Sequence, residues 1–284
     1  MTNEPFTLIR PQAGGVPILH DSPHSGRAYP DDFNSALPLE LLRRAEDAYV
    51  DQLLEDVPDS GATLLHAHFP RAYIDANRSS LDIHPRILAD RPDVALAPGE
   101  KSELRIGLIR EIVTPGLEIY DRKLAWAEVE SRIERYWRPY RTALTNELHR
   151  LRDRHGRVLH IQWHSMKSVG NAATPDGPGN RRADMVLGDR HGRSCSRAVR
   201  DLVDGLLRQR GFRVALNDPY AGGAVLGELA DVEGGIECLQ VEINRALYLD
   251  EIRVEKTAGF AELKAHISSL TNALAEEIKR NRPS

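Results

Sequence analysis

RVLHIQWHSM, residues 157–166, is the stretch of sequence that decides the fold. Its apolar residues predict a strand, and His164 stands close to the end of that strand. A long helical stretch, residues 120–156, precedes it; Pro139 should kink or divide that helix, and Gly156 should end it. A helix followed directly by a strand indicates an α/β protein.

The same alternation continues on both sides of this stretch. The other predicted helices span residues 37–57, 197–211 and 257–281, and the other predicted strands span 17–20, 61–69, 185–187, 212–218 and 236–248. Residues 71–78 are predicted to form a strand edge that runs into a loop. Residues 82–115 show few clear periodicities and are predicted to form a long ordered segment, called the excursion below. This order predicts the α/β class, with a mainly parallel or mixed twisted sheet and helices on both faces. No internal repeat or low-complexity linker divides the chain, so we expect one domain over residues 1–284.

The composition bears on partners and location. Charged residues make up 28% of the 284 residues, the net charge is −4, and both signs intermix, which argues against nucleic-acid binding. No apolar run approaches the roughly 18 residues that span a bilayer, so we expect no membrane partner. The stretch MTNEPFTLIR lacks a basic segment followed by an apolar one, so no secretion signal is expected. Cys195 and Cys238 lie far apart, which favours a reduced, cytoplasmic protein over a disulfide scaffold; a monomer and a small homo-oligomer both remain open.

Histidine, carboxylate and arginine side chains gather where the predicted strands end. In open α/β sheets, functional sites form at the carboxyl ends of the strands. The residues concerned are His24; Arg71, Asp75, Asn77 and Arg78; His164; Asp218; and Glu242, Asn244 and Arg245.

His24 and His164 follow different strands and are candidate metal ligands. Two imidazoles and one carboxylate form a common catalytic zinc set. Glu46 is the expected carboxylate because it shares the apolar face of the predicted helix 37–57, where a buried charge needs a partner. Asp47 is the alternative, since sequence alone places helix boundaries and rotation only roughly. A histidine after a strand is also commonly an ordinary hydrogen-bonding loop residue, and the chain has no compact His-Glu-x-x-His signature.

QVEINR places a carboxylate, Glu242, in the last predicted strand. That carboxylate is a candidate general base toward an attacking water, and a structural ion pair with Arg245 is the alternative. Arg71, Arg78 and Arg245 are candidates for holding a substrate carboxylate, because a guanidinium presents a planar fork. Surface ion pairing is the alternative for each of them. The Asn77–Arg78 pair is the preferred clamp.

A nucleophilic serine is the rival chemistry. Ser22, Ser25 and Ser165 stand next to the candidate histidines or close to them, but no Gly-x-Ser-x-Gly elbow is present. No phosphate-binding loop and no strand-linked Gly-x-Gly-x-x-Gly occurs either, so nucleotide binding is unsupported. His20 is expected to be a structural neighbour of the site.

Eight stretches, taken in order, resemble the N-formylglutamate amidohydrolase (N-formylglutamate deformylase) family. They are DSPHSGRAYP, AEDAYVDQL, FPRAYIDANR, GLIREIVTPGLEIYDRKL, HSM, VLGDRHGRSC, NDPYAGG and LQVEINRALYLDE. The resemblance implies hydrolysis of N-formyl-L-glutamate to formate and glutamate, a step of histidine degradation. It also implies an α/β fold similar to zinc carboxypeptidases and aspartoacylase (phosphorylase/hydrolase-like), with Zn²⁺ or another divalent metal as cofactor.

The wider kinship with carboxypeptidases implies roles for single residues. His24 and His164 look like the histidine ligands, Glu242 like the base, and Asn77–Arg78 like the carboxylate clamp. Two positions depart from the pattern. Arg27 stands where the carboxypeptidases have their ligand glutamate, so the carboxylate must come from elsewhere. Trp163 stands where the deformylases are expected to have a smaller residue, which suggests a reshaped pocket.

Three functions therefore follow as hypotheses. The first is a zinc-dependent amidohydrolase of N-formyl-L-glutamate, with Arg245 or Arg71 assisting Arg78. The second is a zinc hydrolase of another N-acyl amino acid or a small peptide. The third is a metal-free protein of the same fold that binds carboxylates. In each case the expected partner is a small molecule.

Overall fold

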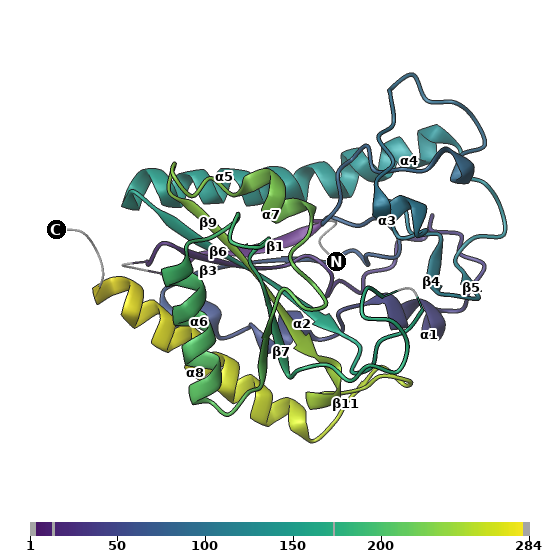
Figure 1. Cartoon of the computed structure of the whole chain (residues 1–284). Coiled ribbons are helices and arrows are strands. Elements are labelled where there is room, and N and C mark those ends of the chain that lie inside the picture. The colour runs from purple at the N-terminus through teal and green to yellow at the C-terminus, as the bar shows by residue number, and fades with distance from the viewer. Residues whose placement is uncertain (1–3, 13–14, 173, 281–284) are drawn as a thin grey trace.

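The computed structural model describes residues 4–12, 15–172 and 174–280. A twisted sheet forms the centre of the molecule (Figure 1). It has seven strands in the order β1-β3-β2-β6-β9-β7-β8. Its strands are β1 Phe6–Ile9, β2 Ile18–Ser22, β3 Thr63–Ala67, β6 Val158–Met166, β7 Met185–Gly188, β8 Val214–Leu216 and β9 Ile236–Asn244.

The sheet is mixed, with a parallel centre. β3, β2, β6 and β9 run parallel to one another, and β7 runs parallel to β8. β1 is antiparallel to β3, and β7 is antiparallel to β9. The carboxyl ends of β2, β6 and β9 therefore meet at one edge, as the predicted α/β class requires.

Helices cover both faces of the sheet, and each face has its own apolar core (Figure 1). α4 Trp126–Arg132, α5 Arg138–His155 and α7 Ala224–Leu229 pack on one face. α2 Val50–Leu53, α6 Arg197–Gln209 and α8 Gly259–Arg280 pack on the other. The predicted fold class is confirmed.

β6 shows how the sequence distributes its side chains between these faces. Successive side chains of a strand point to opposite faces. Leu159, Ile161 and Trp163 pack into the core under α6 and α8. His160, Gln162 and His164 therefore face α5, and this polar row runs toward the carboxyl edge of the sheet.

The prediction of one helix over residues 37–57 is wrong. The chain forms α1 Leu39–Leu42 and a short 3-10 turn to Ala45, and it then breaks. Glu46 is extended, with ψ 150°, and Tyr49 has a positive φ of 63° before α2 begins. The backbone N–H of Asp47 donates to the His24 carbonyl at 3.0 Å, so a contact between distant segments replaces the helical hydrogen bond.

The long helical stretch from residue 120 begins later than predicted, at α4. A π turn over residues 133–137 joins α4 to α5, and Pro139 lies in the first turn of α5. Pro139 has no N–H to donate to the preceding turn, and the π turn lies directly before it, where that helical bond is missing. Gly156 ends α5 with φ 75°, as predicted. Residues 71–78 form a turn and loop, so the predicted strand edge is wrong.

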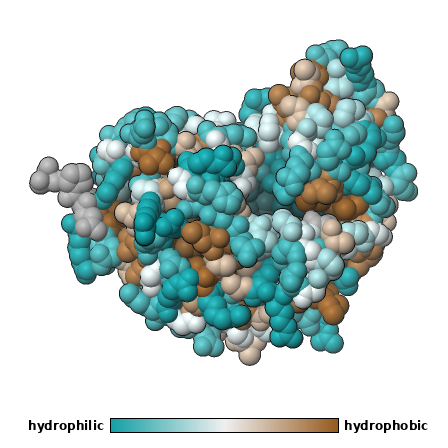
Figure 2. All heavy atoms as spheres, viewed as in Figure 1, coloured by the Kyte–Doolittle hydropathy of each residue, from teal (hydrophilic) through white to brown (hydrophobic). Residues whose placement is uncertain are grey.

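The remaining elements are short. They are α3 Glu100–Glu103, β4 Ile112–Thr114, β5 Leu117–Glu118, β10 Leu249–Asp250 and β11 Glu255–Lys256. Figure 2 shows hydrophilic residues over most of the visible face, with small separate hydrophobic groups and a hollow near its centre. Within the described ranges, no helix combines the length and apolar character that a membrane crossing needs.

Candidate metal centre and active site

The candidate residues gather at the carboxyl edge of the central strands. His24 lies two residues beyond β2, while His164 and Glu242 lie near the ends of β6 and β9. His164 and Glu242 are register partners on adjacent parallel strands. Parallel strands thus bring together three side chains that lie far apart in the sequence.

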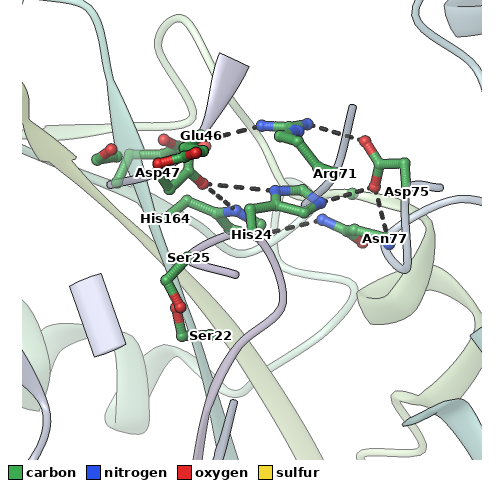
Figure 3. A network of polar contacts seen from close by, with 12 residues as sticks. Ser22, His24, Ser25, Glu46, Asp47, Arg71, Asp75, Asn77 and His164 are labelled. Atoms are coloured by element: carbon green, nitrogen blue, oxygen red, sulfur yellow. Dashed lines mark hydrogen bonds and ion pairs between the residues drawn. The ribbon is translucent and has the colours of Figure 1, made fainter. Parts of the chain in front are cut away.

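Two imidazoles and one carboxylate converge in this site (Figure 3). Asp47 Oδ2 lies 3.0 Å from His164 Nδ1 and 3.4 Å from His24 Nδ1. One ligand atom from each of the three residues lies within 4.8 Å of the others, and all three residues are buried. His24 Nδ1 is buried without a hydrogen-bond partner, so it can offer its lone pair to a cation. This set of donors fits a zinc ion.

The far nitrogens of both rings meet polar partners. His24 Nε2 lies 2.6 Å from Asp75 Oδ1, and His164 Nε2 lies 3.1 Å from Gln162 Oε1. An imidazole that donates from Nε2 keeps its Nδ1 lone pair for a metal, as in the carboxylate–histidine arrangements of zinc sites. Burial opposes ionisation of Asp75, but the charges of His24 and Arg71 hold its pKa well below the usual range. Asp75 is therefore a carboxylate that orients His24.

Asp75→Asn is expected to weaken zinc binding by about tenfold to a hundredfold, because His24 would lose its anionic partner. Competition with a chromophoric chelator measures this affinity. Asp32→Asn is the control, since Asp32 is exposed and bonds Tyr73 instead. Equal zinc affinity in the Asp75 variant and the wild type would contradict the orienting role.

The structure brings Asp47, not Glu46, to the histidines. Glu46 accepts a hydrogen bond from Tyr29 at 2.8 Å and lies 3.5 Å from Arg43, so its carboxylate is engaged elsewhere. The helical face that favoured Glu46 does not exist, because the helix breaks at this residue. The alternative named from the sequence, Asp47, occupies the expected position of the carboxylate.

Arg71 and Arg245 hold the second oxygen of Asp47. Arg245 Nη2 donates to Asp47 Oδ1 at 3.0 Å, and Arg71 Nη1 lies 3.5 Å from the same oxygen. Burial opposes ionisation of Asp47, but its contacts with His164 and His24 hold its pKa well below the usual range. Arg71 also donates to Asp75, at 3.0 Å. Both arginines thus bond carboxylates of the site, and both also line the cavity, so their substrate-binding roles stay a prediction.

Of the four predicted substrate-binding residues, Arg78 alone keeps a guanidinium without an acidic partner in the described part of the chain. It donates to the backbone oxygens of Ile106 and Asn77. The Asn77 side chain accepts from the Val225 N–H at 3.1 Å and lies 3.2 Å from His164 Nε2. Asn77 therefore joins α7 to the histidine–aspartate group.

Glu242 is buried at the edge of the cavity, with 8% of its surface exposed. Gln240 donates to its Oε1 at 3.0 Å. Burial raises the pKa of Glu242; His164 opposes this shift and the charge of Asp47 adds to it. No cation of the described chain lies within ion-pair distance, so the alternative of a structural pair with Arg245 does not occur. A carboxylate with a raised pKa can take up a proton and release it.

The cavity over these residues has a volume of about 270 Å³ and a strongly cationic lining. Among the described residues, Glu242 is the one acidic side chain of that lining. The basic side chains are Arg44, Arg71, Arg78, Lys101, Arg110, Lys167, Arg182 and Arg245. Such a lining suits a small anionic ligand. The sequence offered no signal for Lys101 and Arg110, which lie in the irregular excursion.

Arg27, the departure from the carboxypeptidase pattern, and Trp163, the departure from the residue expected in the deformylases, are not among the residues that line the cavity. Trp163 is buried on the opposite face of the sheet, where its indole N–H donates to His20 Nδ1 at 2.9 Å. The expectation that Trp163 reshapes the pocket is therefore wrong, and His20, its hydrogen-bond partner, is not among the cavity-lining residues. Arg27 is 46% exposed and lies 3.6 Å from Asp51.

The serines do not form a nucleophilic site with the histidines. Ser22 donates to Ser25 at 2.9 Å, and Figure 3 shows this pair apart from the histidine–aspartate group. Ser165 accepts a hydrogen bond from Arg245 at 3.0 Å.

Comparison with known proteins gives consistent results. The model of the N-formylglutamate amidohydrolase family matches residues 16–249. An N-formylglutamate deformylase from Pseudomonas putida is 27% identical over 242 residues, covering 84% of each chain. One from Pseudomonas aeruginosa is 28% identical over 267 residues, covering 93% of this chain and 92% of the relative. A crystal structure of N-formylglutamate amidohydrolase from Ralstonia eutropha JMP134 superposes with a TM-score of 0.92 at 44% identity, covering 97% of this chain and 99% of the other.

Proposed function

We propose, since this chain belongs to the N-formylglutamate amidohydrolase family, that it hydrolyses N-formyl-L-glutamate to formate and L-glutamate. We also propose that the enzyme uses a divalent metal ion, with zinc as the first candidate, and that the reaction is a step of histidine degradation. One observation carries it. The converging atoms of His24, Asp47 and His164 lie beside a small cavity whose charged lining residues are Lys and Arg apart from Glu242.

The residues present fit a metal ion well. His24 Nδ1, Asp47 Oδ2 and His164 Nδ1 would hold it, and Asp75 and Gln162 would keep the two rings in place. A bound zinc ion would polarise the formamide carbonyl and make water a better nucleophile near neutral pH.

Glu242 is the proposed general base. It would accept a proton from the attacking water and deliver that proton to the amine that leaves as glutamate. Its raised pKa suits both steps, since the carboxylate must hold the proton between them. Arg78 would hold the carboxylate next to the scissile amide, because its neighbour Asn77 contacts His164.

Arg78→Ala is expected to raise KM by about tenfold or more, because it removes a charge-assisted contact with a substrate carboxylate. A lower kcat should accompany this change if Arg78 also aligns the amide for attack. Steady-state formate release measures both constants. Arg122→Ala is the control, since Arg122 pairs with Glu128 outside the cavity. Unchanged kcat/KM would remove Arg78 from the site.

A panel of N-formyl, N-acetyl and N-succinyl amino acids tests the proposed substrate. N-formyl-L-glutamate should give the highest kcat/KM. A higher value for another N-acyl amino acid would favour the second hypothesis, a related zinc hydrolase. Protein purified without chelator that contains no metal and hydrolyses none of the panel would favour the metal-free binding protein.

We further propose that the enzyme acts in the cytoplasm. Cys195 and Cys238 are both buried free thiols, which is common in a reducing compartment.

A further inference from the structure

Arg110 is a buried cation for which the described part of the chain supplies no side-chain partner. It lines the cavity with 8% of its surface exposed. Its Nε is buried and lacks a hydrogen-bond partner. Throughout the described residues, no side-chain hydrogen bond or ion pair of Arg110 is found. Other buried arginines differ, since Arg132 pairs with Glu128, Arg182 with Asp176 and Arg245 with Asp47.

The surroundings of Arg110 make its isolation costly. Burial and the nearby charge of Arg71 lower its pKa to about 9, and Arg78 acts in the same direction. Asp75 and Asp47 oppose this effect, but both carboxylates are already bonded to other groups. An unpaired buried charge is unfavourable unless something compensates it. An anion bound in the cavity would supply this compensation.

The position of Arg110 separates it from Arg78. Arg78 is fixed by two backbone oxygens and follows Asn77, which contacts His164. Arg110 comes from the segment between α3 and β4. Burial and the charge of Arg245 lower the pKa of Lys167, which lies just beyond β6, and the charge of Arg110 acts in the same direction. Among the described residues of the lining, Arg44, Arg78 and Arg110 are the arginines without an acidic partner, and Arg110 is the buried one of the three. Arg78 and Arg110 lie on different segments, so the pair can bind the two carboxylates of a dicarboxylate.

We propose that Arg110 binds the side-chain carboxylate of the substrate and thereby selects N-formyl amino acids that carry a second carboxylate. This inference rests on the proposed function and assigns the other end of the substrate, the carboxylate beside the scissile amide, to Arg78. Arg110 is a specificity-determining residue in this arrangement, because its contact is absent for substrates with neutral side chains.

N-formyl-L-glutamate and N-formyl-L-glutamine test the proposal, because they differ only in a side-chain carboxylate or amide. Arg110→Gln should lower kcat/KM for the glutamate substrate by about thirtyfold or more, as expected for the loss of one partner from a buried charge pair. The value for the glutamine substrate should change by less than about threefold, since no charge pair is lost there. Arg91→Gln, an exposed arginine of the same excursion, should leave both values unchanged.

Two results would overturn the proposal. Equal losses on both substrates would move Arg110 to the carboxylate beside the amide or to a structural role. Unchanged kcat/KM for both substrates would remove it from substrate binding. Arg110→Lys keeps the charge without the fork, so it should retain a preference for the glutamate substrate.

Stability and product binding give independent readouts. Arg110→Gln should unfold at the same temperature as the zinc-loaded wild type or at a higher one, because it removes an uncompensated charge. L-glutamate should raise the unfolding temperature of the wild type more than that of the variant; a lower temperature for the free variant would indicate a structural role. Calorimetry with L-glutamate and L-glutamine tests Arg110 even if the wild type releases no formate, so the two proposals can fail separately.

Discussion

Replacing Glu242 by Gln is expected to lower kcat by about 10²- to 10⁴-fold, the usual contribution of a general acid–base group. The substitution keeps the shape of the side chain and an oxygen that can accept from Gln240, but the amide cannot take a proton from water. Glu242 is not among the three converging ligands, so the variant should retain its metal. Rapid-mixing or steady-state formate assays measure the rate, and elemental analysis measures the metal.

Glu237→Gln is the matched control for this variant. Glu237 lies on the same strand, β9, but it accepts a hydrogen bond from the Ser196 N–H and does not line the cavity. Its substitution should leave kcat close to the wild-type value. A Glu242→Gln variant that keeps wild-type kcat would show that another group takes the proton.

Asp47→Asn is expected to weaken zinc binding by at least about a hundredfold. This loss is larger than the one expected for Asp75→Asn, because Asp47 is a proposed ligand and Asp75 only orients His24. It removes the charge that His24 and His164 face, and it leaves Arg71 and Arg245 without their shared anion. Breaking a buried ion pair from one side typically costs about 3–5 kcal/mol of stability. The free energy of unfolding should therefore fall together with the zinc affinity.

Glu46→Gln is the neighbouring control and decides between the two carboxylates. Its hydrogen bond with Tyr29 can persist with an amide, so zinc affinity should change little. Measurements on folded protein, checked by circular dichroism, separate loss of metal from loss of structure. Zinc retained by the Asp47 variant and lost by the Glu46 variant would reverse the assignment.

The order of elements was predictable because most of it depends on local patterns. The strand in residues 157–166 and the helices near 197–211 and 257–281 appear as β6, α6 and α8. Their apolar periodicities match the faces that they bury. The rule that sites form at strand ends also placed His24, His164 and Glu242 in one cavity.

The carboxylate ligand was not predictable from the same patterns. The choice of Glu46 required a continuous helix, whereas the chain breaks where Asp47 N–H bonds the His24 carbonyl. Such a contact between distant segments leaves no periodic signal in the sequence. Asp47 could be named only as an alternative for this reason.

The partners of the arginines were also not predictable from local sequence patterns. Proximity to a strand end marked Arg71 and Arg245, but it did not reveal that Asp47 and Asp75 would engage them. Arg110 comes from a segment with little regular structure, and only the folded chain shows that it enters the cavity without a partner. Pairing between side chains of separate segments is a property of the tertiary structure.

The central claim is metal-dependent hydrolysis of N-formyl-L-glutamate. The most direct test is to measure formate release before zinc is removed, after it is removed, and after it is added back. The zinc-loaded protein should release formate, the stripped protein should lose this activity, and about one equivalent of zinc should restore it, as a three-ligand catalytic site requires. Full activity in the stripped protein, or no formate from the zinc-loaded protein, would contradict the account.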